Sequence, residues 1–171
     1  MRQIKINSTE GSEIVLVATA KDYMRVSTSV DDNIITRMIT QARIWCENYI
    51  SRDIVSKNRT YYMDETNGTF DLPFGPVASI SSVTSDGTSV SYSVLGLDNE
   101  TIELDGGYAD KVKVTYITSG LSDSLLQSAI MQLTSTYYDN RADFSSDQKS
   151  NVESIPTNVR DILNSYKAMY L

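Results

Sequence analysis

The sequence has 171 residues, of which 40% are hydrophobic and 22% charged, with three prolines, eight glycines and one cysteine. A chain of this length buries roughly 70% of its unfolded surface, and its composition is unlike that of disordered, collagenous or disulfide-built proteins. The net charge is −7 and histidine is absent, which excludes an overall basic nucleic-acid-binding protein and removes the commonest general base.

The first sixteen residues leave two structures open, a strand or a flexible arm. They lack the apolar core of a signal peptide, and the longest apolar run, residues 14–20, is too short for the ~20 residues that span a bilayer. We therefore expect a soluble protein that is made in the cytoplasm.

Helical periodicity dominates the next part of the chain, residues 17–56. Apolar residues recur at spacings of three and four across residues 31–51, which predicts a long helix behind Asp31 and Asp32, and a shorter helix precedes it. Cys46 lies on the apolar face of the long helix, so we expect a buried, reduced thiol.

The period becomes alternating from about residue 58 to residue 118, with turn signals between short runs. The pair Asp86-Gly87 predicts the clearest hairpin, because a tight turn of this type needs residues that tolerate a positive φ. We expect a small antiparallel sheet inserted at 57–118. Residues 61–118 hold nine Asp or Glu against two Lys or Arg, so this part of the segment is strongly acidic.

Helical spacing returns at residues 122–140 behind Ser122, followed by a polar loop at 142–155 and a short carboxy-terminal helix. The order predicts one domain over residues 1–171, in which 17–56 and 119–171 form the helical parts and 57–118 the insertion. The predicted fold class is α+β: a helical core with a small antiparallel β-sheet insertion.

Candidate sites for chemistry are weak. The stretch "TYYDNRADF" at 136–144 offers Arg141 for an anion, with Asp139 to hold it, but no tuned acid, base or nucleophile is adjacent, which favours a structural helix end. Loop carboxylates could bind calcium but lack the spacing of a calcium loop. These carboxylates are Glu100, Glu103, Asp105 and Asp110. We expect no metal, no cofactor and no catalytic residue.

Four motifs in chain order resemble the head-tail connector proteins of long-tailed bacteriophages and gene-transfer agents, also called adaptor or head-completion proteins. The first, a K-x-x-L-R-V helix followed by an acidic helix start and E-x-Y, is matched by Lys21, Met24, Arg25, Val26, Asp31, Asp32, Glu47 and Tyr49, with methionine in place of leucine. The second, a proline corner, is matched by Leu72, Pro73, Pro76, Val77, Ser79, Ile80, Ser82 and Val83. The third, Y-x-N-R at a helix end, is matched by Tyr138, Asn140 and Arg141, and the fourth is the segment "IPTNVRDILNSYK".

The resemblance implies a structural virion protein and no enzyme. Such a protein forms a ring under the portal, links the capsid vertex to the stopper and tail, and extends the DNA channel without binding a particular sequence. Its partners would be the portal protein, a head-closure or tail-completion protein, and further copies of itself in a dodecameric ring, with a monomer expected in isolation. It would act in the capsid-tail neck after assembly in the host bacterial cytoplasm, with no membrane contact.

The carboxy-terminal segment is a common portal-docking element in this family, and aromatic anchors suit such a role. The residues expected at the portal or ring interface are Tyr138, Arg141, Tyr166, Met169, Tyr170 and Leu171.

Two alternatives stay open. Another neck or tail-completion protein could also combine a small sheet with a few helices, so the fold alone does not separate it from a head-tail connector. A hydrolase using paired carboxylates would place Glu103 and Asp105 on one face of a strand, although no sequence feature predicts a pocket beside them.

Overall fold

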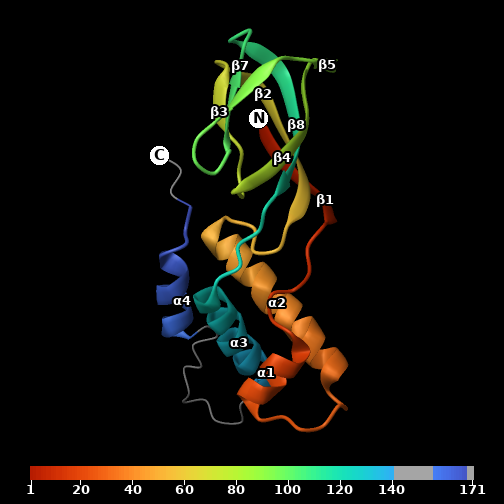
Figure 1. The fold of residues 1–171 in the computed structure, drawn as a ribbon, viewed down its shortest axis with the longest axis vertical. Helices are drawn as coiled ribbons and strands as arrows, with labels where there is room; N and C mark the ends of the chain where they lie inside the picture. The colour runs from red at the N-terminus through yellow and green to blue at the C-terminus, as the bar shows by residue number, and fades with distance from the viewer. Residues whose placement is uncertain (141–155, 169–171) are drawn as a thin grey trace. The chain divides into compact units, whose positions relative to one another are not determined.

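The computed structural model describes residues 1–140 and 156–168 (Figure 1). The α-helices are α1 (Val17–Met24), α2 (Asp32–Ile50), α3 (Ser124–Asp139) and α4 (Thr157–Asn164). The strands are β1 (Arg2–Thr9), β2 (Lys57–Thr66), β3 (Thr69–Asp71), β4 (Val77–Ser85), β5 (Thr88–Ser89), β6 (Tyr92–Leu95), β7 (Thr101–Leu104) and β8 (Ala109–Thr118). Two compact units result: a strand unit of Met1–Ser12 and Ser51–Leu121, and a helical unit of the described residues in Glu13–Ile50 and Ser122–Leu171.

The strand unit consists of two antiparallel sheets. The larger has the order β1-β2-β8-β4-β5 and the smaller the order β3-β7-β6. Side chains from both sheets form one hydrophobic core, as expected when two sheets pack face to face. The core residues are Tyr61, Met63, Phe70, Leu72, Val77, Val83, Ile102, Leu104, Val112, Val114 and Tyr116.

The prediction of a helical core with a small sheet insertion is wrong. Strands hold about as many residues as helices, and the sheets bury a hydrophobic core of their own. The error has two physical causes. Residues that the sequence left open, Arg2–Thr9, become β1 and pair with β2, and the alternating segments pack against one another to close a two-sheet structure.

The hairpin predicted at Asp86-Gly87 is confirmed. Ser85 pairs with Thr88, and the two turn residues have φ angles of 46° and 83°. Both values lie in the left-handed region that a two-residue hairpin turn of this hand requires.

Each helix of the helical unit buries one apolar face. The buried side chains include Ile35, Ile39, Ala42, Cys46 and Ile50 on α2, Leu126, Ala129, Ile130 and Leu133 on α3, and Val159 and Leu163 on α4. The cap of α3 is Asp123, whose Oδ1 accepts the Leu125 N–H at 2.7 Å, and not Ser122 as the sequence suggested. Across residues 1–140 and 156–168, no helix has the length and hydropathy that crossing a bilayer requires.

Candidate functional site

The residues expected at the interface divide between two groups. Tyr138 and Tyr166 belong to the helical unit and are half-buried. Arg141, Met169, Tyr170 and Leu171 lie outside the described residues, so their placement stays a prediction. The geometry of the site is therefore built from the two tyrosines and their neighbours.

Tyr138 lies near the end of α3, where its hydroxyl donates to Asp31 Oδ2 at 2.6 Å. Asp31 directly precedes α2, and its carbonyl accepts the N–H of Ile35 within the first turn. The hydroxyl of Tyr138 thus ties the end of α3 to the start of α2, which gives this side chain a structural task within the subunit.

Tyr166 follows α4 and donates its hydroxyl to Asp123 Oδ1 at 2.6 Å. The same oxygen accepts the Leu125 N–H, so one carboxylate caps α3 and anchors the segment after α4. The hydrogen bond from Tyr166, and then that from the Leu125 backbone, lowers the pKa of Asp123, while the bond to Asp123 raises the pKa of Tyr166.

An aromatic platform joins α2 to α4. Trp45 and Tyr49 stack with ring centroids 5.2 Å apart, and the Tyr49 hydroxyl donates to Asn164 Oδ1 at 2.9 Å. Lys167 Nζ lies 5.4 Å from the centroid of the Tyr49 ring, and the Ala168 N–H donates to the Ile50 carbonyl at 2.9 Å. The last described residues are therefore held on α2, and this fixes the point from which residues 169–171 continue.

The carboxylates considered for metal binding or hydrolysis are not assembled into a centre. Glu103 is exposed on β7 and Asp105 is exposed just past the end of that strand. Asp110 instead accepts the Tyr108 hydroxyl at 2.7 Å, which raises the pKa of Tyr108 to about 12. No cluster of three metal-ligating side chains is found among the residues that the structure describes.

A buried ionic cluster in the strand unit escaped the sequence analysis. Asp53 is fully buried and accepts hydrogen bonds from Lys57 Nζ at 2.8 Å and from Arg59 Nε at 2.7 Å and Nη2 at 2.6 Å. The Thr118 hydroxyl donates to the same carboxylate at 2.9 Å, and the Arg59 guanidinium lies 3.8 Å from the centroid of the Phe74 ring. Burial by itself raises the pKa of Asp53, but the bonds from Arg59 and Lys57 outweigh it and leave the pKa lowered. The i,i+4 spacing of Asp53 and Lys57 was the available signal.

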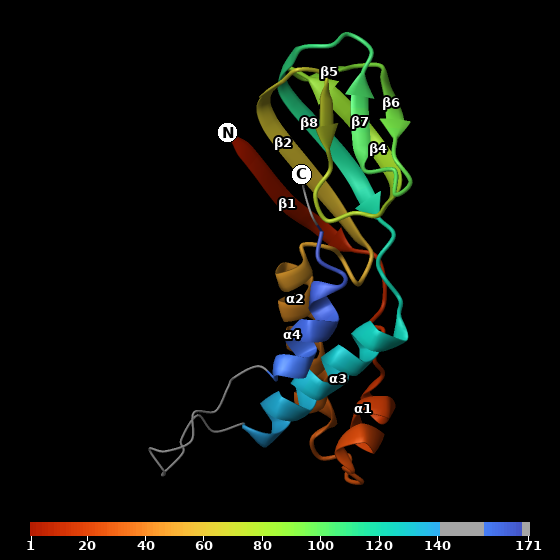
Figure 2. The same ribbon diagram turned by 90° about the vertical axis from the view of Figure 1, so that its left-hand side faces the viewer.

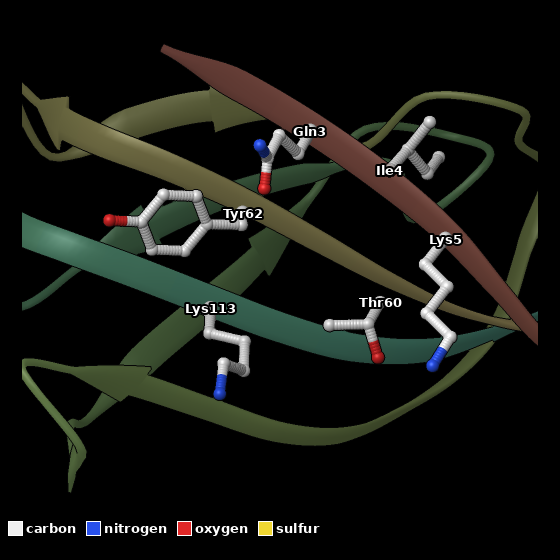
Figure 3. Close-up of a pocket in the computed structure, with 6 residues that line it drawn as sticks. All are labelled: Gln3, Ile4, Lys5, Thr60, Tyr62 and Lys113. Atoms are coloured by element: carbon white, nitrogen blue, oxygen red, sulfur yellow. The ribbon is translucent and has the colours of Figure 1, made fainter.

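The outer face of the larger sheet carries a shallow polar hollow (Figure 3). Gln3, Ile4 and Lys5 of β1, Thr60 and Tyr62 of β2, and Lys113 of β8 line it. Burial, followed by the hydrogen bond with Asp64, raises the pKa of Tyr62 above its ordinary value. These groups can form hydrogen bonds and attract anions, and they are chemically suited to a contact surface.

Sequence comparison decides the family. A sequence model described as head completion protein matches residues 13–169, which is most of the chain. The chain belongs to the head completion protein family. No curated protein matches it.

Three solved structures resemble this head completion protein over nearly its whole length. A chain in the neck of an empty gene transfer agent particle, computed with C6 symmetry, has a TM-score of 0.75, 16% identity and coverage of 99% of this chain and 97% of that chain. A chain in the virion of a native gene transfer agent particle has a TM-score of 0.72, 16% identity and coverage of 98% and 96%. A chain in the neck of a native particle, computed with C12 symmetry, has a TM-score of 0.68, 16% identity and coverage of 99% and 97%.

The family assignment confirms the resemblance drawn from the four sequence motifs. It identifies the chain as a head completion protein, and its fold is like that of chains in the necks of gene transfer agent particles. The arrangement of the described side chains agrees with this identity, because the aromatic and hydrogen-bonding groups hold helices together and present contact surfaces.

Proposed function

We propose that this head completion protein assembles as a ring, dodecameric in the virion, beneath the portal. There it links the capsid vertex to the stopper or tail-completion protein and prolongs the channel through which DNA passes. The observation that supports this most strongly is the near full-length likeness of the fold to chains of neck structures computed with cyclic symmetry. Assembly would take place in the host bacterial cytoplasm.

The portal contact is proposed at the end of the helical unit. Its anchors are Arg141 together with Met169, Tyr170 and Leu171, which follow the segment held by the Ala168-to-Ile50 hydrogen bond. Tyr138 and Tyr166 support this surface from within the subunit, because their hydroxyls are bound by Asp31 and Asp123. In many interfaces a few well-packed apolar and aromatic side chains supply most of the binding energy.

The charge of the protein suits a passage for DNA. The net charge is −7, and residues 61–118 hold nine acids against two bases, so this part of the protein repels phosphates. A channel wall of this sign lets DNA slide without being gripped.

The test is co-sedimentation with the portal ring from the same genome, comparing the full chain with a chain that ends at residue 168. This truncation removes three of the four proposed anchors, Met169, Tyr170 and Leu171. It leaves Val159, Leu163 and Tyr166 in place, so the helical unit keeps its packing. We expect the full chain to sediment with the portal and the shortened chain to remain in the supernatant.

The other outcomes separate the alternatives. Binding by both chains would move the anchor away from residues 169–171. Binding by neither would contradict the portal contact and favour a neck protein that acts on the tail side. A Tyr166→Phe variant is the matched control. It keeps the aromatic ring but loses the hydrogen bond to Asp123, so it tests the anchoring of the segment after α4 without removing residues 169–171.

A further inference from the structure

The larger sheet ends in two open edges, and both leave apolar side chains of the core side uncovered. The strand at one edge is β1, whose eight residues are all exposed (Figure 2). No strand of the described chain pairs with β1 on the side away from β2. An open edge of this length is a template for pairing with another chain.

Two apolar side chains of β1 lie on the core side of the sheet but are not covered. Ile4 pairs with Tyr61 and Ile6 with Arg59, and both partners are buried on the core side of the sheet. Paired residues of antiparallel strands point to the same face, so Ile4 and Ile6 also point to the core side. They nevertheless remain 39% and 48% exposed.

The backbone of β1 has hydrogen-bonding groups directed outward. The Asp64 N–H donates to the Met1 carbonyl at 3.1 Å, which makes Met1 and Asp64 a hydrogen-bonded pair. Because such pairs alternate along antiparallel strands, Gln3 and Lys5 bond to β2. The N–H and C=O groups of Ile4 then point away from β2.

The opposite edge of the same sheet offers a matching opening. Strand β5 pairs only with Thr84 and Ser85 of β4, and no described strand pairs with residues 78–82 of β4 on the side away from β8. At the start of this edge the Val77 N–H already donates to the Asp98 carbonyl at 2.9 Å, and β4 is irregular near Ala78 and Ser81. A hollow of about 240 Å³ lies beside this edge, and Val77, Ile80, Tyr92 and Val94 contribute apolar lining.

Val94 shows that the hollow opens onto the hydrophobic core of the strand unit. It pairs with Ile102, which is fully buried, and therefore points to the same inner side of the smaller sheet. Val94 is still 41% exposed. An additional strand beside β4 would cover it.

We propose that β1 of one copy adds to the β4 edge of the next copy, so that Ile4 and Ile6 close the hollow beside Val94. The proposal rests on the ring proposed above and names the surfaces that join its subunits. The chemistry of the two surfaces is compatible, because residues 77–82 of β4 carry no charged side chain that would repel Arg2 or Lys5 of β1.

Strand direction also fits a ring. Successive strands β1, β2, β8 and β4 are antiparallel, so β4 runs opposite to β1. A rotation about an axis along the strands carries β1 to the next copy without reversing it, and it arrives antiparallel to β4. Two different surfaces meeting head to tail close into a ring, whereas a contact between two β1 strands would stop at a two-fold dimer.

The test is cross-linking between copies bound to the portal ring of the same genome. Lys5→Cys is combined with Ser79→Cys, because both side chains lie on the outer face of the sheet, and a short bifunctional maleimide allows for small differences in register. The native Cys46 does not interfere, because it is fully buried and burial raises its pKa to about 12.

We expect the double variant to give a ladder of cross-linked oligomers, and each single variant to give none. Dimers from Lys5→Cys alone would overturn the proposal in favour of a β1-to-β1 contact. Portal-bound protein that yields no ladder would overturn the β1-to-β4 contact while the proposed function stands. Absence of any portal-bound protein would instead contradict the proposed function, and the inference with it.

A proline variant tests the backbone contact separately. Ile4→Pro, made in the double-cysteine chain, removes one outward N–H but no bond to β2, so β1 keeps its pairing within the subunit. Relative to Ile4→Ala, which loses the side chain but keeps the N–H, we expect the ladder to fall about tenfold. Equal yields from the two variants would contradict strand addition.

Discussion

At the scale of single residues, Asp53 is the centre of a buried ionic cluster in the strand unit. It is fully buried and bound by Lys57, Arg59 and Thr118. A buried charge is costly unless it is paired and hydrogen-bonded, and here both conditions are met. Removal of the carboxylate would leave Lys57 and Arg59 buried without the negative charge that they share.

We expect Asp53→Asn to lower the free energy of unfolding by about 3–5 kcal/mol, the usual cost of removing one partner of a buried pair. Urea denaturation followed by circular dichroism measures this loss. The control is Asp86→Asn, which breaks an exposed pair with Lys111 and should change the free energy of unfolding little. Equal losses in the two variants would show that burial of the Asp53 cluster adds nothing.

The same carboxylate gives the protein a defined sensitivity to acid. Because the pKa of Asp53 is lowered in the folded state, its charge stabilises the fold fully above its unfolded pKa, about 3.9. This stabilisation is lost as the pH falls through the lower, folded pKa. We therefore expect the difference in unfolding free energy between the parent and Asp53→Asn to be constant from pH 5 to 7. The difference should shrink below about pH 4, and one that grew on acidification would contradict this assignment.

The sequence showed the composition of this cluster but not its burial. Asp53, Lys57 and Arg59 are residue types that usually lie at the surface, and they follow a helix where polar residues are common. Their contacts depend on Thr118, 65 positions from Asp53 along the chain. A distant partner of this kind leaves no periodic signal.

At the scale of elements, α4 is the clearest case of a segment held by a few contacts. Val159 and Leu163 are its fully buried side chains, and Asn158, Asn164 and Tyr166 add polar bonds to α3, α2 and the α3 cap. A short helix is marginal alone in water, so its order depends on this packing.

We expect Leu163→Ala to destabilise the protein by about 2–5 kcal/mol, because it removes a fully buried side chain and leaves a cavity. Arg160→Ala on the exposed face of α4 is the matched control. Trp45 fluorescence during urea denaturation reports the change, since Trp45 stacks on Tyr49 and Tyr49 bonds to Asn164. A loss no larger than that of the control would contradict the docking of α4.

Elements differ in how well the sequence reveals them. The hairpin at Asp86-Gly87 was visible because its signal is local and each turn residue has a distinct conformational role. Strand β1 was not, because all eight of its residues are exposed and it shows no buried face. The four family motifs combine fixed residue types at helix ends and a proline corner with parts of β4 and α4. They identified the family where periodicity gave the wrong fold class.

At the scale of the whole molecule, the balance between strands and helices was the main error. Periodicity assigns an element type but does not show whether a set of strands can bury its own core. Here eleven residues of the strand unit do so. The candidate site was equally dependent on the fold, because the partners of Tyr138 and Tyr166 lie 107 and 43 positions away along the chain.

The net charge of −7 leads to a prediction about DNA. We expect no measurable binding of the isolated protein to a random DNA duplex at physiological salt, because net repulsion opposes the phosphate contacts that drive non-specific binding. Fluorescence anisotropy of a labelled duplex measures this. Lys5→Glu/Lys113→Glu serves as the control, because it removes the two lysines of the polar hollow. Binding in the parent that this variant abolishes would show that the hollow contacts DNA.

The order in which the chain builds its two units affects how the protein folds during synthesis. Residues 1–12 belong to the strand unit, the chain then enters the helical unit, returns at Ser51 and leaves again after Leu121. At about 5–20 residues per second, β1 leaves the ribosome seconds before its partner β2, and α4 is the last described element to emerge. Nascent β1 is thus an unpaired strand until Lys57–Thr66 emerges. A translation pause between Thr9 and Lys57 would prolong this exposure.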